Sequence, residues 1–518
     1  MLTQRSSGIL MHPTSLPSRG GIGDLGAAAY QFIDWLAAAK QTVWQVLPIG
    51  PAGYGNSPYS CTSAFAGNVL MISLERLVER GYLEGARLDG SKNGTTPVDY
   101  DAARAYKLPL LREAARNFLQ SENRTSLERF EAFCFENEWW LEDYALFSVL
   151  REHFSESAWN SWPADIRGRK PETLEELREE LKDPIALERV LQFAFFEQWK
   201  SLREYCSPRG IRIVGDVAIF VSYDSADVWT HPDIFRLDEN LSPLVVAGVP
   251  PDAFSETGQR WGNPLYDWDA LKARGYDWWV ERMKWAVETC DIVRLDHFRG
   301  FEACWEIPAD EPTAINGHWT PGPNEDLFKR LKAVLGTLPF IAEDLGYITP
   351  EVRELRKKLK IPGMKVMQFG FGNKGAHIYL PHMFTPDSVV YTGTHDNDTT
   401  VGWWANSATE AEKEWAVQYL GQTSDGINWA FIRSAFSSVA ELAVIPVQDV
   451  LGLDSDARMN IPSKPGGNWT WRLHPEALTP EIAEKLALLT VLTDRDAATK
   501  DAEKPEDQEQ TIAAEFAA

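Results

Sequence analysis

The sequence predicts an α/β protein built on an eight-stranded (β/α)8 barrel, the TIM-barrel fold. Short apolar runs of the length typical of buried parallel strands recur along the chain, and turn residues or charges bound each of them. Helical patterns lie between most of these runs, and the number of runs, eight, is that of the strands in such a barrel. The predicted strands cover residues 8–13, 43–49, 211–220, 291–298, 339–346, 364–371, 389–396 and 442–449.

The predicted helices lie where the barrel needs them, between consecutive strands. One amphipathic stretch precedes the second strand, and others precede the fourth, fifth, sixth and eighth. This alternation of strands and helices is typical of repeated βα units. The predicted helices cover residues 25–40, 277–290, 325–336, 350–359 and 427–441.

The long interval between the second and third predicted strands breaks this rhythm. Residues 60–207 hold several amphipathic stretches, such as 130–154 and 171–205, and are predicted to form a mostly helical insertion subdomain. The catalytic barrel is expected to span residues 1–493, with further subdomains formed by its loops. Residues 494–518 are charged and lack apolar periodicity, which predicts a disordered acidic tail.

Composition excludes several classes of protein. The formal net charge of −24 opposes binding to the phosphates of nucleic acids. No stretch approaches the roughly 20 apolar residues that span a bilayer, and the first residues lack a signal-peptide core, so a cytoplasmic protein without a membrane partner is expected. The five cysteines are far apart and form no C-x-x-C pair, which predicts buried thiols. A monomer and a homodimer both stay open.

The stretch DIVRLDHFRGF, residues 291–301, places Arg294, Asp296 and His297 inside an apolar strand pattern. In a barrel of this kind the catalytic side chains lie at the carboxyl ends of the strands. We therefore expect these three residues at the rim of an active site and not in the core. Other predicted strands carry polar residues at or near the same end, namely Asp216, Glu343, Asp344, Gln368, His395, Asp396 and Asp398.

Carboxylates at these ends, combined with 21 Trp, 24 Phe and 15 Tyr, favour chemistry on a glycosidic bond. One acid attacks or supports the anomeric carbon while a second protonates the leaving oxygen. Arg294 lies on the same side of its strand as Asp296 and would keep it ionised as a nucleophile. Glu343, if partly desolvated, would stay protonated as the acid. The sequence shows no zinc motif, serine elbow or phosphate-binding loop, so no metal and no cofactor are implied.

The motifs RLDHFRGF, AEDLG and TGTHDND together resemble the amylomaltases, which are 4-α-glucanotransferases or disproportionating enzymes related to the α-amylase group of retaining enzymes. The likeness covers roughly residues 8–472. Because the chain starts almost at its first predicted strand, it resembles the compact members of that family. The other motifs that carry the likeness are GILMHPTSLPS, GIGDLG, GNSPYS, DVAIFVSYDSADVW, VAGVPPDAFSETGQRWGNPLYDW, KVMQFGFG and NIPSKPGGNW.

The resemblance implies Asp296 as nucleophile, Glu343 as general acid/base and Asp396 as a third carboxylate that grips the sugar. It also implies α-1,4-glucans and maltooligosaccharides as substrates, with glucose as an acceptor. The residues implied to bind the substrate are Ser57, Tyr59, Asp216, Gln259, Trp261, Arg294, His297 and His395. Of these, Gln259 and Trp261 are expected on a loop that overhangs the cleft.

Two alternatives stay open. An α-glucan hydrolase would use the same acids, and a non-catalytic glucan-binding protein could have kept the fold. The sequence also departs from the family at one place, because Met383 and Phe384 follow LPH where an Asn and a Tyr are common. The hydrogen bonds of those two side chains are therefore in doubt, whereas the three carboxylates are intact.

Overall fold

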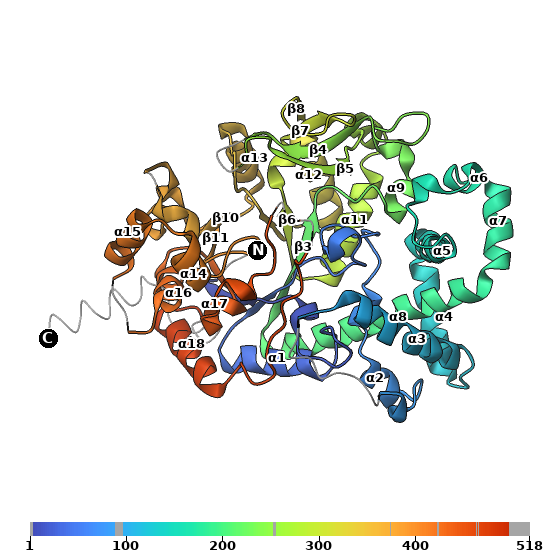
Figure 1. Cartoon of the computed structure of the whole chain (residues 1–518), viewed down its shortest axis with the longest axis horizontal. Coiled ribbons are helices and arrows are strands. Elements are labelled where there is room, and N and C mark those ends of the chain that lie inside the picture. The colour runs from blue at the N-terminus through green and yellow to red at the C-terminus, as the bar shows by residue number, and fades with distance from the viewer. Residues whose placement is uncertain are drawn as a thin grey trace.

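The computed structural model describes residues 4–88, 97–251, 255–372, 374–421, 424–462, 464 and 466–496 of the 518-residue chain. Eight parallel strands close into a barrel in the spatial order β1-β12-β11-β10-β9-β6-β3-β2 (Figure 1). Each overlaps one predicted strand, so the predicted fold class is confirmed. The predicted ranges run past the carboxyl ends of the observed strands into the segments that follow them. The strands are β1 (Ser6–Leu10), β2 (Val43–Gln45), β3 (Arg212–Ala218), β6 (Ile292–Asp296), β9 (Phe340–Ala342), β10 (Gly363–Val366), β11 (Ser388–Tyr391) and β12 (Leu442–Pro446).

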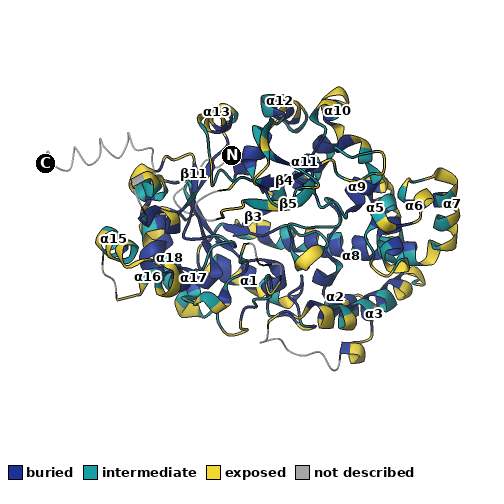
Figure 2. Cartoon of the chain, turned by 45° about the horizontal axis from the view of Figure 1, so that its top comes forward, coloured by how far each residue is buried: buried dark blue, intermediate teal, exposed yellow. Residues whose placement is uncertain are grey.

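Helices surround this barrel, and the five predicted ones are present. Figure 2 shows buried residues along the strands and exposed residues on the outer helices. The predicted helices are observed as α1 (Ala27–Ala38), α11 (Asp277–Thr289), α12 (Asn324–Leu335), α13 (Pro350–Leu359) and α16 (Ile427–Ser437). Further short or late helices are α9 (Ala226–Thr230), α10 (Trp268–Ala273), α14 (Thr400–Gly402), α15 (Glu410–Leu420), α17 (Val447–Leu451) and α18 (Pro480–Leu492).

The interval between β2 and β3 is mostly helical and lies on the side of the barrel opposite α14–α18 in Figure 1. The stretch 130–154 forms two helices because Asn137 interrupts it, with its side-chain amide donating to the Phe133 carbonyl at 2.8 Å. The 25-residue helix α8 leads almost directly into β3. The helices of this interval are α2 (Leu74–Glu79), α3 (Tyr100–Leu119), α4 (Arg124–Glu136), α5 (Glu138–His153), α6 (Ala164–Arg167), α7 (Pro171–Glu180) and α8 (Lys182–Cys206).

A second, antiparallel sheet lies beside the barrel and was not predicted. Its order is β5-β4-β7-β8, with β4 (Val245–Val249), β5 (Gln259–Pro264), β7 (Ala303–Pro308) and β8 (His318–Pro321). The expectation that Gln259 and Trp261 lie on a loop is therefore wrong, because both belong to β5. The polar sequence QRWGNP lacks a strand pattern, and its pairing with β4, where Arg260 lies opposite Gly248, makes it a strand.

Apolar side chains fill the barrel interior and separate its two open ends. Val214, Ile292, Ile341, Val389 and Val444 belong to this layer and are at most 2% exposed. No helix in the described ranges has the length and apolar character needed to cross a membrane.

The folded chain continues past the predicted start of the tail at residue 494. The side chain of Arg495 is fully buried and donates hydrogen bonds to six backbone carbonyl oxygens. The predicted tail therefore begins too early. Its remaining residues, 497–518, lie outside the described residues.

Candidate active site

Arg294 links two carboxylates at the carboxyl end of the barrel. It lies on β6 opposite Asp216 of β3 in the strand register. Its Nη1 donates to both oxygens of Asp216, at 2.8 and 2.7 Å, and its Nη2 donates to Oδ1 of Asp296 at 2.9 Å. The side chains of Arg294 and Asp216 are 4% and 0% exposed, whereas that of Asp296 is 28% exposed. A buried ion pair thus holds Asp296 at the open surface of the site.

Glu343 follows β9 directly and is held by two backbone amides. Its Oε2 accepts from the His297 N–H at 2.7 Å and its Oε1 from the Leu345 N–H at 3.1 Å. Burial, followed by the negative charge of Asp296, raises the pKa of Glu343 to about 8, although Arg294 and the two amides oppose this shift. The carboxyl group of Glu343 is therefore protonated at neutral pH.

Asp396 lies past the end of β11, and its carboxylate is fixed by residues from two segments. Asn460 donates its side-chain amide to Oδ1 at 2.7 Å, and Nε2 of His395 lies 3.3 Å from Oδ2. Burial alone would raise the pKa of Asp396, but the charge of His395 and the hydrogen bonds from His395 and Asn460 outweigh it and lower the pKa below its usual value. Asp396 is therefore ionised throughout the neutral range.

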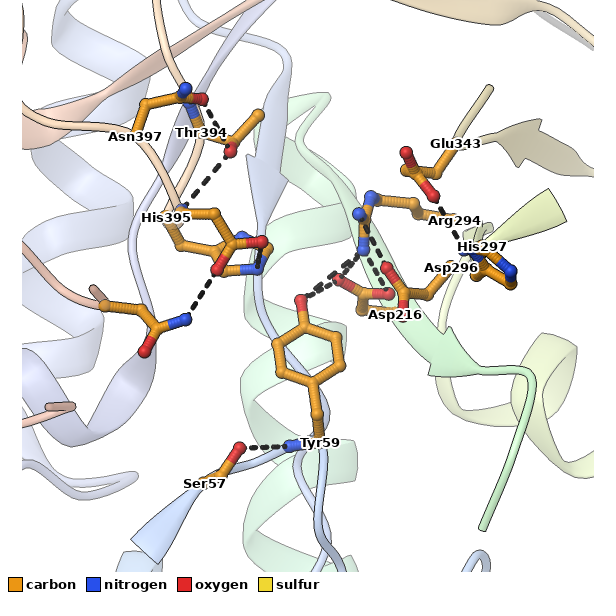
Figure 3. Close-up of polar contacts among 12 residues, drawn as sticks. Ser57, Tyr59, Asp216, Arg294, Asp296, His297, Glu343, Thr394, His395 and Asn397 are labelled. Atoms are coloured by element: carbon orange, nitrogen blue, oxygen red, sulfur yellow. Dashed lines mark hydrogen bonds and ion pairs between the residues drawn. The ribbon is translucent and has the colours of Figure 1, made fainter. Parts of the chain in front are cut away.

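Tyr59 joins the two halves of the site. Its hydroxyl donates to Oδ2 of Asp216 at 2.7 Å, and its ring stacks on the His395 ring with centroids 5.1 Å apart. Figure 3 shows Tyr59 between Asp216 and Arg294 on one side and His395 on the other. Ser57 lies two residues away, where its hydroxyl accepts from the Tyr59 backbone N–H at 3.2 Å. The hydroxyl of Ser57 therefore shapes this turn.

Trp261 and Gln259 reach the same site from β5. The Trp261 ring packs edge-to-face on His297, with centroids 4.8 Å apart, and its Nε1 donates to the Gln259 side-chain oxygen at 3.1 Å. Trp261 is still 39% exposed. Burial lowers the pKa of His297 to about 4, and its buried Nε2 has no hydrogen-bond partner in the described ranges. His297 is therefore neutral at pH 7, with one ring nitrogen unused.

Three other polar residues predicted at strand ends have structural roles. Asp344 accepts from the Met364 N–H at 2.8 Å and pairs with Arg356 at 3.2 Å. Asp398 accepts from the Ser455 hydroxyl at 2.8 Å, and its backbone carbonyl accepts from Gln368, also at 2.8 Å. These contacts give Asp344, Gln368 and Asp398 supporting roles around the site.

Sequence reasoning missed the residues that the segment after β12 contributes. Besides Asn460, Arg458 donates to the Asp396 carbonyl at 2.7 Å, and Trp469 packs against Tyr59 and His395. The motif NIPSKPGGNW was the available signal, since it begins at Asn460 and ends at Trp469.

Met383 and Phe384, which follow LPH where an Asn and a Tyr are common in the family, lie in different environments. Phe384 is 8% exposed and belongs to the hydrophobic core, whereas Met383 is 53% exposed. Neither side chain can replace the hydrogen bonds of an Asn or a Tyr.

The comparison with known proteins agrees with this arrangement. A family model described as 4-alpha-glucanotransferase matches residues 11–479. The chain belongs to this family. It is 49% identical over 500 residues to the 4-alpha-glucanotransferase of Synechocystis sp., covering 96% of this chain and 99% of that protein. It is 48% identical over 499 residues to the enzyme of the same name from Thermus thermophilus, covering 95% and 99%.

A solved structure is similarly close. The amylomaltase from Streptococcus agalactiae in complex with acarbose superposes with a TM-score of 0.92 at 39% identity, covering 95% of this chain and 100% of that chain. The resemblance to amylomaltases noted from the motifs is therefore confirmed. Within the described ranges, no group of three or more His, Cys, Asp and Glu side chains is placed to hold a metal ion.

Proposed function

We propose that the protein transfers α-1,4-glucan segments from a donor maltooligosaccharide to the 4-hydroxyl of an acceptor glucan or glucose, by a retaining double displacement. One observation carries this proposal. Asp296 is held open by Arg294 while the nearby Glu343 has a pKa raised to about 8, so one carboxyl group is available for attack and the other carries a proton. Membership of the 4-alpha-glucanotransferase family supports the same reaction.

In the first step a carboxylate oxygen of Asp296 attacks the anomeric carbon of the donor. Oδ1 is engaged by Arg294, which leaves Oδ2 for the attack. As the glycosidic bond breaks, Glu343 gives its proton to the departing oxygen, and the released chain leaves with a new hydroxyl group. The product is a β-glycosyl ester of Asp296 and an ionised Glu343. The two carboxyl groups of such a pair should lie about 5 Å apart.

In the second step the ionised Glu343 takes the proton of the acceptor's 4-hydroxyl. The acceptor oxygen attacks the anomeric carbon and displaces Asp296, so the α-configuration returns. A group that serves as acid and then as base works best when its pKa lies near the working pH. The raised pKa of Glu343 meets this requirement at neutral pH.

The remaining polar groups would hold the sugar ring beside the cleaved bond. Asp396 and His395 form a rigid pair that can accept and donate hydrogen bonds to sugar hydroxyls. Tyr59, fixed by Asp216, offers a flat ring at the same place. The partly exposed Trp261 would cover the acceptor and exclude water, which favours transfer over hydrolysis.

The test is a product profile after incubation of the purified protein with maltotriose alone. Transfer predicts glucose together with a ladder of longer maltooligosaccharides and a nearly constant number of reducing ends. Glucose and maltose without longer products would contradict the proposal and indicate a hydrolase. No product, combined with binding of maltooligosaccharides, would indicate a glucan-binding protein. The Asp296→Asn variant is the matched control, because it keeps the side-chain shape and removes the nucleophile.

A further inference from the structure

A pocket of about 640 Å³ opens at the amino-terminal end of the barrel, opposite the active site. Its wall includes Ser6, Thr42, Arg212 and Asp291, which lie at or next to the first residues of the neighbouring strands β1, β2, β3 and β6. Ligand pockets usually measure several hundred Å³, so this one has room for a small molecule.

The wall of this amino-terminal pocket is strongly basic in a protein whose net charge is −24. Among the described residues, only two acidic ones, Glu204 and Asp291, line it. Asp291 is already engaged, because it accepts from the Ile213 N–H at 2.7 Å and from Arg203 at 3.1 Å. The five basic residues are Arg5, Lys200, Arg203, Arg212 and Arg495.

Three of the five basic residues have structural roles that account for them. Arg203 pairs with Asp291 and donates to the Glu288 carbonyl. Arg495 donates to six backbone carbonyls, including that of Ser6 at 2.8 Å, and Arg5 donates to the carbonyls of Ser438 at 2.8 Å and Thr493 at 3.1 Å. Their donors are used, but neither makes an ion pair with a carboxylate in the described ranges. Burial and repulsion by Arg5 lower the pKa of Arg495 to about 9. Both guanidinium groups therefore add positive charge to the pocket.

Arg212 and Lys200 have no such role. Arg212 is half-buried at the start of β3, and neither its guanidinium nor the exposed ammonium of Lys200 has a hydrogen bond or ion pair among the described residues. Burial lowers the pKa of Arg212, with Asp291 opposing, yet a guanidinium stays charged in proteins. A partly desolvated charge without a partner is unfavourable, and a bound anion would relieve it.

We propose that the amino-terminal pocket binds a sugar phosphate, whose phosphate group is held by Arg212 and Lys200. Arginine and lysine donors suit the charged oxygens of a phosphate. The pocket is much larger than a phosphate ion, and Gln4, Thr42 and Ser207 give its wall polar groups that suit a hydroxylated body.

Isothermal titration calorimetry of the full chain with glucose 1-phosphate, inorganic phosphate and glucose tests this proposal. The wild type should bind glucose 1-phosphate saturably and more tightly than inorganic phosphate. The Arg212→Met variant should lose at least about tenfold in affinity, since charge-assisted hydrogen bonds are removed. Lys200→Ala, a change at an exposed position, should weaken binding several-fold. Arg209→Ala is the matched control, because Arg209 pairs with Asp34 and does not line the pocket.

Three outcomes would overturn the proposal. If the wild type does not bind glucose 1-phosphate, the pocket is not a binding site. If glucose 1-phosphate and inorganic phosphate bind with equal affinity, the pocket does not recognise the sugar. Binding that is unchanged in both Arg212→Met and Lys200→Ala would place the ligand elsewhere, as in the active site. Transfer activity on maltotriose reports that each variant is folded, because the packed interior of the barrel separates this pocket from the active site.

Discussion

The two mouths of the barrel differ in charge and in what their charges contact. The carboxyl-terminal mouth gathers Asp216, Asp296, Glu343 and Asp396 around a single buried Arg294, which bonds directly to two of them. The amino-terminal mouth gathers five basic side chains, and three of these, Arg5, Arg203 and Arg495, donate to backbone carbonyls. The charged groups at the carboxyl-terminal mouth interact with one another, and these interactions set their protonation states. Most of the charged groups at the amino-terminal mouth instead stabilise the fold.

Strand β3 shows this contrast within seven residues. Arg212, Val214 and Asp216 lie on one face of the strand, because side chains alternate along it. Arg212 lines the amino-terminal pocket, Val214 belongs to the apolar interior, and Asp216 is buried against Arg294. Substitutions at the carboxyl-terminal mouth should therefore change the rate of transfer, whereas substitutions at the amino-terminal mouth should change stability or ligand binding.

Asp296→Asn should give the largest loss. It removes the nucleophile without changing the side-chain shape, so the transfer rate on maltotriose should fall at least about 10⁴-fold. Initial rates measure this loss, and an unchanged unfolding midpoint shows that the variant is folded. A variant that retained a tenth of the wild-type rate would place the nucleophile elsewhere.

Glu343→Gln should lower the transfer rate on maltotriose about 10³-fold, because general acid/base catalysis is lost. The wild-type pH profile supplies a second measurement. Burial and the charge of Asp296 raise the pKa of Glu343 to about 8, so the active protonated form is lost as the pH rises through this value. kcat/KM for maltotriose should then fall about tenfold per pH unit above it. A rate that stays constant up to pH 10 would exclude Glu343 as the acid.

Arg495→Met should affect stability and not catalysis. It leaves several buried carbonyls at the amino-terminal mouth without a donor, which should lower the free energy of unfolding by about 3 kcal/mol. Denaturant unfolding measures this loss. The transfer rate per folded molecule should stay within a factor of about two of the wild type, since the packed interior lies between the two mouths. A large loss of rate would show that the mouths are coupled.

Asn460→Ala should have a moderate effect on catalysis alone. It removes the 2.7 Å hydrogen bond to Asp396, while His395 still holds the other oxygen. We expect kcat/KM for maltotriose to fall about tenfold, which corresponds to one charge-assisted hydrogen bond. Asn460→Asp is the comparison variant, because it keeps the shape and places a like charge beside Asp396. An alanine variant as active as the wild type would show that Asn460 does not contribute to catalysis.

Arg212→Met should have the smallest effect in the absence of ligand. Its guanidinium has no partner among the described residues, so removing it should leave the free energy of unfolding unchanged or raise it by up to about 1 kcal/mol. Denaturant unfolding without phosphate in the buffer measures this. A loss as large as that for Arg495→Met would mean that Arg212 stabilises the fold.

Local pattern was sufficient to predict the barrel and to place Asp296, Glu343 and Asp396 at strand ends, whereas the resemblance to the amylomaltases singled out these three among the polar residues there. Each barrel strand is a short apolar run, and Asp296, Glu343 and Asp396 stand where such a run turns polar. What local pattern could not give are contacts between distant residues. Asn460 and Asp396 are 64 positions apart, and only the path of the chain between them brings them together.

Contacts between distant segments also explain why the strand β5 and the folded position of Arg495 were not predicted. QRWGNP becomes β5 through its hydrogen bonds with β4, although its own sequence favours a loop. Arg495 is a charged residue in a charged segment, but the carbonyls at the ends of α16 and β1 bury it. β5 and Arg495 thus both depend on segments that lie elsewhere in the chain.

Trapping the covalent intermediate would identify the nucleophile itself. The Glu343→Gln variant can still release fluoride from α-maltotriosyl fluoride, because that leaving group needs no proton, but it lacks the base for the second step. Peptide mass mapping should then find one maltotriosyl group on Asp296. Attachment to any other residue, or fluoride release without an adduct, would contradict the assignment of Asp296 as nucleophile and Glu343 as acid/base.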